Sequence, residues 1–276
     1  MAAEPMIDSI PWLTSSVFVT VIVTIALLIV CRRATSKMQL VPVGGQNLFE
    51  AIVEGLYDMF EGVVGKHMIH KCFSLFATLF IFILASNWFG LLPGVGTIGF
   101  GDNPGPWHSL KAVDHPILRP GSADLNMTLA LALLFMVMWL IWTVQEVGAG
   151  AFILHLFAPK GGTSGVLWFC LLPLFIFVGL IEIVSIIFRP VSLSLRLYGN
   201  IFAGENLLHT MGSLGDKLPP FVSSMLSVLL PLPFYFLELL VGILQALVFT
   251  LLCAVYLQLS TSHDDEEDHH PKKHAH

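Results

Sequence analysis

The stretch Ser192-Leu-Ser-Leu-Arg-Leu-Tyr-Gly-Asn200 decides what kind of protein this chain is. It lies inside an almost entirely apolar run from 165 to 260, so Arg196 stands among leucines at membrane depth. Placing a guanidinium near the centre of a bilayer costs roughly 2.5 to 3.5 kcal/mol. A charged residue at that depth usually faces a cavity, a partner or an ion path. An ion-transport site is therefore the first hypothesis for this segment.

Composition places the whole chain in a membrane. Of its 276 residues, 55% are hydrophobic and 12% are charged, whereas a soluble domain carries about 25% charged residues. Much of the net charge of −6 comes from an acidic cluster at 264–268, and no basic patch indicates nucleic-acid binding. The four cysteines have no CxxC spacing, so neither a metal site nor a disulfide framework is indicated. We predict an all-α polytopic membrane protein forming a single membrane domain over 1–276.

Hydrophobic runs in the first part of the chain predict three membrane spans. Arg32 and Arg33 directly follow the first run, so the positive-inside rule puts the N-terminus outside and the end of that span in the cytoplasm. A Gly- and Pro-rich segment between the second and third runs reads as an external loop. The predicted ranges are 11–31 for the first span, 72–92 for the second, 94–124 for the loop and 126–157 for the third.

The segment 47–63 has a different period. Its apolar residues share one helical face and its acidic residues share the other, which predicts an amphipathic helix lying on the cytoplasmic surface. The acidic face carries Glu50, Glu54, Asp58 and Glu61. Helices that lie on lipid usually carry basic residues, so this face either contacts a protein partner or is only solvated.

The last two apolar runs, 165–212 and 219–260, are too long for ordinary spans. As a helix the first would be about 70 Å long, against a hydrocarbon core of about 30 Å. Each run is therefore either a pair of short spans or one long, steeply tilted helix bent at its prolines. Both alternatives leave the acidic, His-rich tail 262–276 in the cytoplasm. Its composition predicts disorder, with a solvated tail favoured over metal binding.

Polar residues in the first of these long runs fall on one stripe. At 100° per residue, six side chains share a narrow sector of the helix. They are Glu182, Ser185, Arg189, Ser192, Arg196 and Asn200. The serines could simply bond to the backbone or to neighbouring helices, and Arg189 could reach for the interface. Arg196, with leucine on both sides, has no such explanation.

Two acidic residues complete the pattern. Glu205 lies nine residues after Arg196, on the opposite side of the same helix, and His209 follows on the side of Glu205. In the next run Glu238 and Gln245 are seven residues apart and share a face. Desolvation favours the neutral form of a buried carboxyl, which suits a proton relay. The alternative is that both carboxyls only form hydrogen bonds across the helix pair.

These residues resemble a known family, subunit a of the F-type ATP synthase. The resemblance extends over the whole chain and is densest in Pro190-Val-Ser-Leu-Ser-Leu-Arg-Leu-Tyr-Gly-Asn-Ile-Phe-Ala-Gly-Glu205. A second matching stretch is Leu244-Gln-Ala-Leu-Val-Phe249 with Val255-Tyr-Leu257. The resemblance implies about five membrane helices, of which the last two are long and strongly tilted against a ring of c subunits.

The resemblance also implies residue roles. Arg196 would be the essential stator arginine, with Glu205, Asn200, Glu238 and Gln245 lining the ion path near it. Some relatives have histidine where this chain has Glu238. The remaining expected site residues are Glu182 and Ser185 on the cytoplasmic side, Asp124 and Asn126 at the outer start of the third span, and His209 beyond Glu205.

By the same resemblance the chain forms two offset half-channels that deliver protons to and from the rotating c-ring and so couple proton flow to ATP synthesis. Its partners would be the c-ring, the peripheral-stalk subunit b, the other subunits of the complex and the bilayer. It would need no cofactor and would not be an enzyme by itself, and the sequence has no GxxxxGK[ST] phosphate loop. The coupling ion is H⁺, the commoner case, or Na⁺, because the carboxylate that binds it belongs to the c subunit.

The expected location is a bacterial inner membrane, since no Arg-rich transit segment is present, with a plastid thylakoid membrane second. The competing functions are a secondary transporter and a structural or receptor-like membrane protein. No internal repeat supports the transporter, and a structural protein does not explain the stripe around Arg196. Co-purification with a ring of small hairpin subunits would separate all three.

Overall fold

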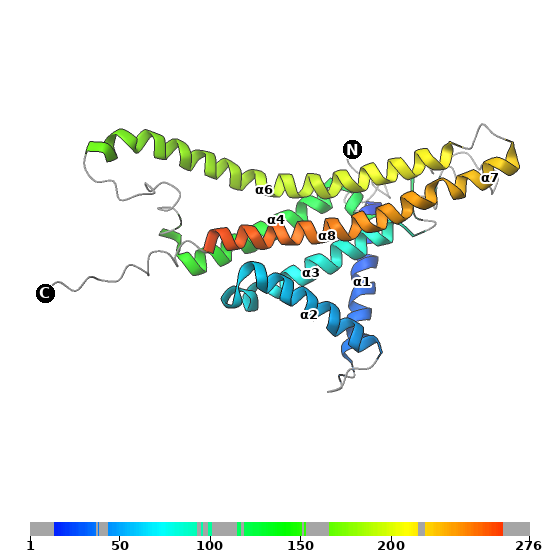
Figure 1. The fold of residues 1–276 in the computed structure, drawn as a ribbon, viewed down its shortest axis with the longest axis horizontal. Helices are drawn as coiled ribbons and strands as arrows, with labels where there is room; N and C mark the ends of the chain where they lie inside the picture. The colour runs from blue at the N-terminus through cyan, green and yellow to red at the C-terminus, as the bar shows by residue number, and fades with distance from the viewer. Residues whose placement is uncertain are drawn as a thin grey trace.

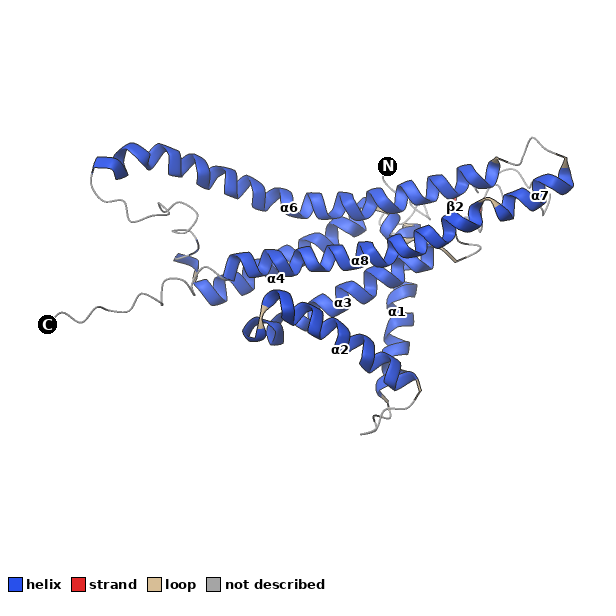
Figure 2. Ribbon diagram, viewed as in Figure 1, coloured by secondary structure: helices blue, strands red, loops and turns tan. Residues whose placement is uncertain are grey.

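The computed structural model describes residues 14–36, 38, 44–92, 95, 99–100, 115–116, 119–150, 152, 166–214 and 219–261. Helices make up nearly all of this part of the chain (Figure 2). Five of them are long and apolar enough to cross a membrane. The prediction of an all-α polytopic membrane protein with five membrane helices is therefore confirmed. The tail 262–276 lies outside the described residues.

The helices follow one another in the order Ser15–Thr35 (α1), Gly45–Val64 (α2), Lys66–Gly90 (α3), Leu125–Val147 (α4), Val166–Ser213 (α6), Pro220–Leu229 (α7) and Pro231–Thr261 (α8). Between α3 and α4, two short strands, Gly99–Phe100 (β1) and His115–Pro116 (β2), pair antiparallel. They are followed by the short 3₁₀ helix Gly121–Ala123 (η1).

Local sequence sets the ends of the first helices. The Thr14 hydroxyl accepts a hydrogen bond from the Val17 amide (3.4 Å) and so caps α1, which has Arg32 and Arg33 in its last turn. Arginines in the last turn suit the negative end of the helix dipole. Gly65, with φ 84°, forms the corner between α2 and α3, where a residue with a side chain would be strained.

The third membrane helix, α4, is shorter than predicted. The Asp124 carboxylate accepts a hydrogen bond from the Asn126 amide (3.0 Å) and caps its start. The helix ends at Val147, well before the predicted end at residue 157. The reason is Gly148, which takes φ 85° and donates its amide to the Val144 carbonyl, a common way for a helix to stop.

The two long apolar runs behave differently. The first forms one continuous helix of 48 residues, α6, with Pro173 and Pro190 inside it. Neighbouring groups can satisfy the backbone freed by a proline within a membrane, so neither proline ends the helix. The second run turns at Leu230, directly before Pro231, and divides into α7 and α8. A 48-residue helix is about 70 Å long and fits a hydrocarbon core of about 30 Å only when steeply tilted.

The arrangement in space centres on the pair α6 and α8. The two helices lie side by side along the long axis of the molecule, while α1 runs across that direction (Figure 1). Towards its N-terminal end α6 diverges from α8 (Figure 1). The opposite face of α8 packs against α3, and α4 contacts both α6 and α8.

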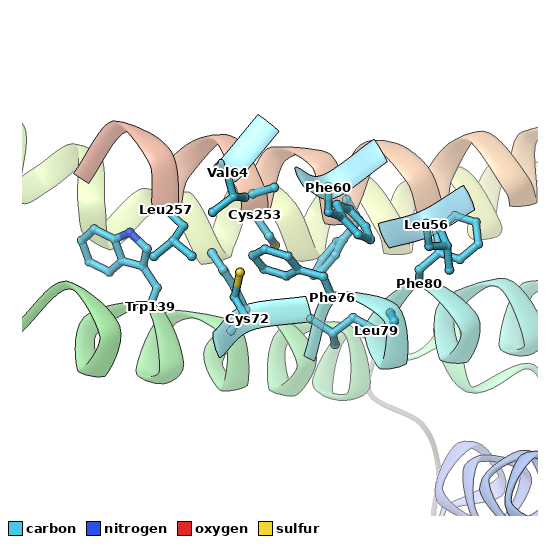
Figure 3. Close-up of a cluster of buried hydrophobic side chains, with 14 of the residues drawn as sticks. Leu56, Phe60, Val64, Cys72, Phe76, Leu79, Phe80, Trp139, Cys253 and Leu257 are labelled. Atoms are coloured by element: carbon cyan, nitrogen blue, oxygen red, sulfur yellow. The ribbon is translucent and has the colours of Figure 1, made fainter. Parts of the chain in front are cut away.

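An aromatic cluster between α2, α3, α4 and α8 holds α8 in place (Figure 3). Phe60, Phe76 and Phe135 are fully buried, and the rings of Phe60 and Phe76 are 5.4 Å apart. Phe76 also meets Trp142 edge to face at 6.2 Å. α8 contributes the fully buried Phe249, Cys253 and Leu257 to the same cluster, so one face of α8 is packed against α2, α3 and α4.

Candidate functional site

The site lies along the contact between α6 and α8. Leu193, Leu197 and Ile201 are buried on one side of α6. Arg196 lies on the flank of this buried face and is exposed, and within the described part of the chain its guanidinium has no hydrogen bond or ion pair. Much of the rest of α6 is also uncovered, including Leu195 at 50% exposure. The arginine that the sequence singled out therefore faces outward from this subunit.

One turn after Arg196, a hydrogen bond joins the two helices. The Asn200 Nδ2 donates to Gln245 Oε1 at 2.6 Å. Gln245 is 4% exposed, and its Nε2 group finds no hydrogen-bond partner among the described residues. A buried amide without a partner costs free energy, so a water or another oxygen is favoured beside this nitrogen, at the contact between α6 and α8.

Further towards the end of α6, two carboxyl groups come together. The Glu238 carboxyl lies directly against Gly204, where a Cβ atom would overlap it. Glu205, the next residue, is close enough to Glu238 for their negative charges to repel. Glu238 and Gln245, which the seven-residue spacing places on one face of α8, both contact α6. Glu205 lies on the far side of α6 from Arg196.

The structure adds a residue that the sequence did not indicate. Arg119, from the segment before η1, forms an ion pair with Glu205, with Nη2 to Oε2 at 3.5 Å. The sequence predicted only an external loop there. The one available signal was the position of an arginine directly before the start of the third span.

At the other end of the polar stripe, the side chains of Glu182, Ser185 and Arg189 lie in different environments. Glu182 is half-buried and Ser185 is exposed. Arg189 lies over the rings of Tyr256 (4.7 Å) and Trp139 (5.6 Å), between α4 and α8. It therefore does not reach for the membrane interface. Its cation–π contacts join three helices directly before Pro190, which gives Arg189 a structural role.

The remaining predicted residues are Asp124, Asn126 and His209. Asp124 is 5% exposed and caps α4, so its carboxylate is engaged by the backbone. Asn126 and His209 are exposed. In the part of the chain that the structure describes, no group of three or more His, Cys, Asp or Glu side chains is placed to hold a metal ion.

Along α6, Arg196 lies between the carboxyl groups of Glu182 and Glu205, while Arg189 is engaged by aromatic rings. At 1.5 Å per residue, Glu182 lies about 21 Å from Arg196 in one direction and Glu205 about 14 Å in the other. Ionisable groups at membrane depth mark ion pathways. A set of membrane helices with a fixed cation between two carboxyl sites therefore defines an ion-translocating membrane protein.

Comparisons with known proteins identify the family. The model of the family described as "ATP synthase A chain" matches residues 13–258. The chain is 34% identical to ATP synthase subunit a of Geobacter sp. (strain M21), over 90% of this chain and 88% of that protein. It is 32% identical to the subunit a of Aliarcobacter butzleri (strain RM4018), over 93% and 92% of the two chains. For Moorella thermoacetica (strain ATCC 39073 / JCM 9320) the identity is 32% and both shares are 88%.

The chain belongs to the ATP synthase subunit a family, the proton-translocating membrane subunits of F-type ATP synthases. The resemblance seen in the sequence is confirmed. Membrane location, proton transport and a part in ATP synthesis follow from membership of this family.

The contact between Gly204 and Glu238 gives a first testable prediction. In Gly204→Ala the new methyl group must displace the Glu238 carboxyl, which is the flexible end of its side chain, so the protein should still assemble. We expect proton flow through the membrane sector to fall about tenfold or more, because a displaced proton-transfer group acts poorly. The measurement is passive proton flow into vesicles under a K⁺ diffusion potential.

Gly212→Ala is the matched control for this variant. Gly212 is on the same helix, and a Cβ there meets nothing within 4 Å. Its proton flow should equal that of the unchanged protein. Equal flow in both variants would mean that the position of the Glu238 carboxyl does not matter.

Proposed function

We propose that this chain is the stator that carries protons to and from a rotating ring of c subunits through two offset half-channels. The outer half-channel uses Glu205, Glu238, Asn200 and Gln245. The cytoplasmic half-channel uses Glu182 and Ser185. Arg196 lies between the two and keeps them separate.

The observation that carries this proposal is the exposed position of Arg196 on the uncovered side of α6, where no described residue forms an ion pair with it. A charge left facing lipid costs roughly 2.5 to 3.5 kcal/mol. A carboxylate on a neighbouring subunit removes that cost. The c-ring of an F-type ATP synthase supplies such a partner, because its ion-binding carboxylates pass at membrane depth.

The mechanism follows from the fixed charge. A proton taken up from the outer side passes by Glu238 and Glu205 to a ring carboxylate and travels round with the ring. When the protonated ring site comes to Arg196, the cation stabilises the carboxylate anion and the proton leaves towards Glu182. The same cation repels a proton that would cross directly, so net flow requires rotation.

Energetics require several protons for each ATP. One charge crossing 100 mV releases about 2.3 kcal/mol, less than the synthesis of one ATP needs. The nucleotide sites belong to other subunits, since this sequence has no phosphate loop. The peripheral-stalk subunit b would hold the chain against the torque of the ring.

The proposed topology has the N-terminus outside and the C-terminus in the cytoplasm, in a bacterial inner membrane. Arg32 and Arg33 in the last turn of α1 support a cytoplasmic end for that helix. Arg119, Glu205 and Glu238 then lie on the outer side.

Crosslinking tests the ring contact. A photoreactive residue in place of Leu195 or Phe202, both exposed on α6, should crosslink to a c subunit in the assembled complex. The matched control is Leu140 on α4, which has a similar exposure of 47% and should not crosslink to c. Absence of any c-subunit product from α6, with the complex intact, would contradict the proposed contact.

A further inference from the structure

The segment that carries Arg119 is held firmly between helices. Pro120 packs onto Gly90 of α3, where an added Cβ would lie 2.8 Å from the proline Cβ. Gly121 lies against Thr20 and Ser16 of α1, so closely that a Cβ would be 2.5 Å from the threonine hydroxyl. η1 also contacts α4 and α6. This short segment is therefore wedged among four helices, and Arg119 has a defined position.

From that position Arg119 reaches one of the two carboxyl groups. Its Nη2 is 3.5 Å from Glu205 Oε2, and the side chains are 32% and 36% exposed. The pair connects the outer loop to the end of α6, two segments that are far apart in the sequence. Partial exposure weakens such a pair, but the wedged loop holds the cation where it is.

The second carboxyl has a different environment. Glu238 lies against Gly204 and feels the negative charge of Glu205. Among the described residues, no basic side chain forms an ion pair with it. The contacts from α3 at this level of α8 are the uncharged Trp88 Nε1 to the Leu239 carbonyl and Asn87 Nδ2 to the Gly242 carbonyl, each 3.4 Å.

Two neighbouring carboxyl groups do not readily ionise together. A cation beside one of them stabilises that one as the anion and leaves the proton to the other. The pair consists of Glu205 from α6 and Glu238 from α8, and the cation beside it is Arg119 from the η1 segment. His209 is exposed one turn beyond Glu205. The arrangement is therefore asymmetric.

We propose that Arg119 is a positioning residue of the outer half-channel, which holds Glu205 as a fixed carboxylate so that Glu238 is the group that exchanges the proton. Glu238 takes a proton from water on the outer side and becomes neutral. It then passes this proton to a ring carboxylate and returns to the anion. This inference rests on the proposed half-channel function.

The test is the pH dependence of proton flow on the outer side, measured in vesicles with the assembled membrane sector under a K⁺ diffusion potential. Removing a cation from beside a carboxyl pair makes the pair hold its proton more tightly. Arg119→Gln should therefore shift the pH profile to higher pH by about one unit. Arg119→Lys, which keeps the charge, should largely restore the original profile.

Two further variants make the result specific. Lys71 forms an ion pair with Glu146 between α3 and α4, away from the carboxyl pair, so Lys71→Gln removes a paired cation without touching Glu205. Its profile should not move. In a Glu205→Gln background, Arg119→Gln should cause no further shift, because its partner is already neutral.

An unchanged profile for Arg119→Gln in an assembled complex would overturn the inference, and so would an equal shift in the Glu205→Gln background. Arg196→Ala in vesicles with the complete ATP synthase, assayed as proton flow coupled to ATP synthesis, separates this failure from failure of the proposed function. If Arg196→Ala abolishes coupled flow while Arg119→Gln changes nothing, only the role of Arg119 is wrong. If coupled flow survives Arg196→Ala, the half-channel function itself is wrong.

Discussion

Replacing Arg196 by alanine is expected to abolish both proton-driven ATP synthesis and ATP-driven proton pumping in reconstituted vesicles. The guanidinium remains charged at any accessible pH, and in our proposal it is the group that makes a ring carboxyl release its proton. An opposite charge within a few ångströms changes the proton affinity of a carboxyl by about 10- to 1000-fold. We expect both activities to fall by about 100-fold or more.

Arg33→Ala is the control for Arg196→Ala. It removes the same charge from the exposed end of α1, far along the chain from the α6–α8 contact, and coupling should be retained. Subunit composition after purification shows whether each complex has assembled. Coupled synthesis by an assembled Arg196→Ala complex would contradict the assigned role of this arginine.

Much of the fold could be predicted because the membrane imposes a simple rule. A long apolar run must form a helix, since no water is present to satisfy its backbone. The five membrane helices and the amphipathic α2 follow from this rule and from helical periodicity. Periodicity also predicts that Glu238 and Gln245 share one face of α8, although it does not say that this face contacts α6.

The missed features depend on contacts between distant parts of the chain. Arg119 meets Glu205 only because η1 is wedged against α1 and α3, and no periodicity relates a loop residue to a helix residue. Arg189 lies on the stripe by angle, but its partners Trp139 and Tyr256 come from other helices. Helical angle gives the direction of a side chain, and the neighbouring helices decide what it contacts.

The exposure of Arg196 also depends on how distant parts of the chain pack together. The sequence places this arginine at membrane depth but cannot say whether its own chain covers it. The structure leaves it uncovered, at the level where Asn200 and Gln245 join α6 to α8. Among the described residues this cation has no partner. In our proposal a carboxylate of the rotating ring supplies one, which links the fold to the ring.

Glu238→Gln is expected to reduce proton flow about 100-fold, because a positioned proton-transfer group contributes at least that factor. Glutamine keeps the size of the side chain against Gly204 but cannot release and regain a proton. Glu205→Gln should reduce proton flow less, by about tenfold, since in our proposal Glu205 provides the negative charge next to the group that carries the proton. Passive flow through assembled membrane sectors measures both variants.

Glu238→His distinguishes two possible effects of Glu238→Gln, the loss of an exchangeable proton and the change in packing of the side chain. Histidine changes the volume beside Gly204 but restores a group that titrates near neutral pH. Flow in Glu238→His should therefore exceed flow in Glu238→Gln, although glutamine is the closer match in shape. If the order is reversed, packing against Gly204 is what matters at this position, and the proton must travel by another route.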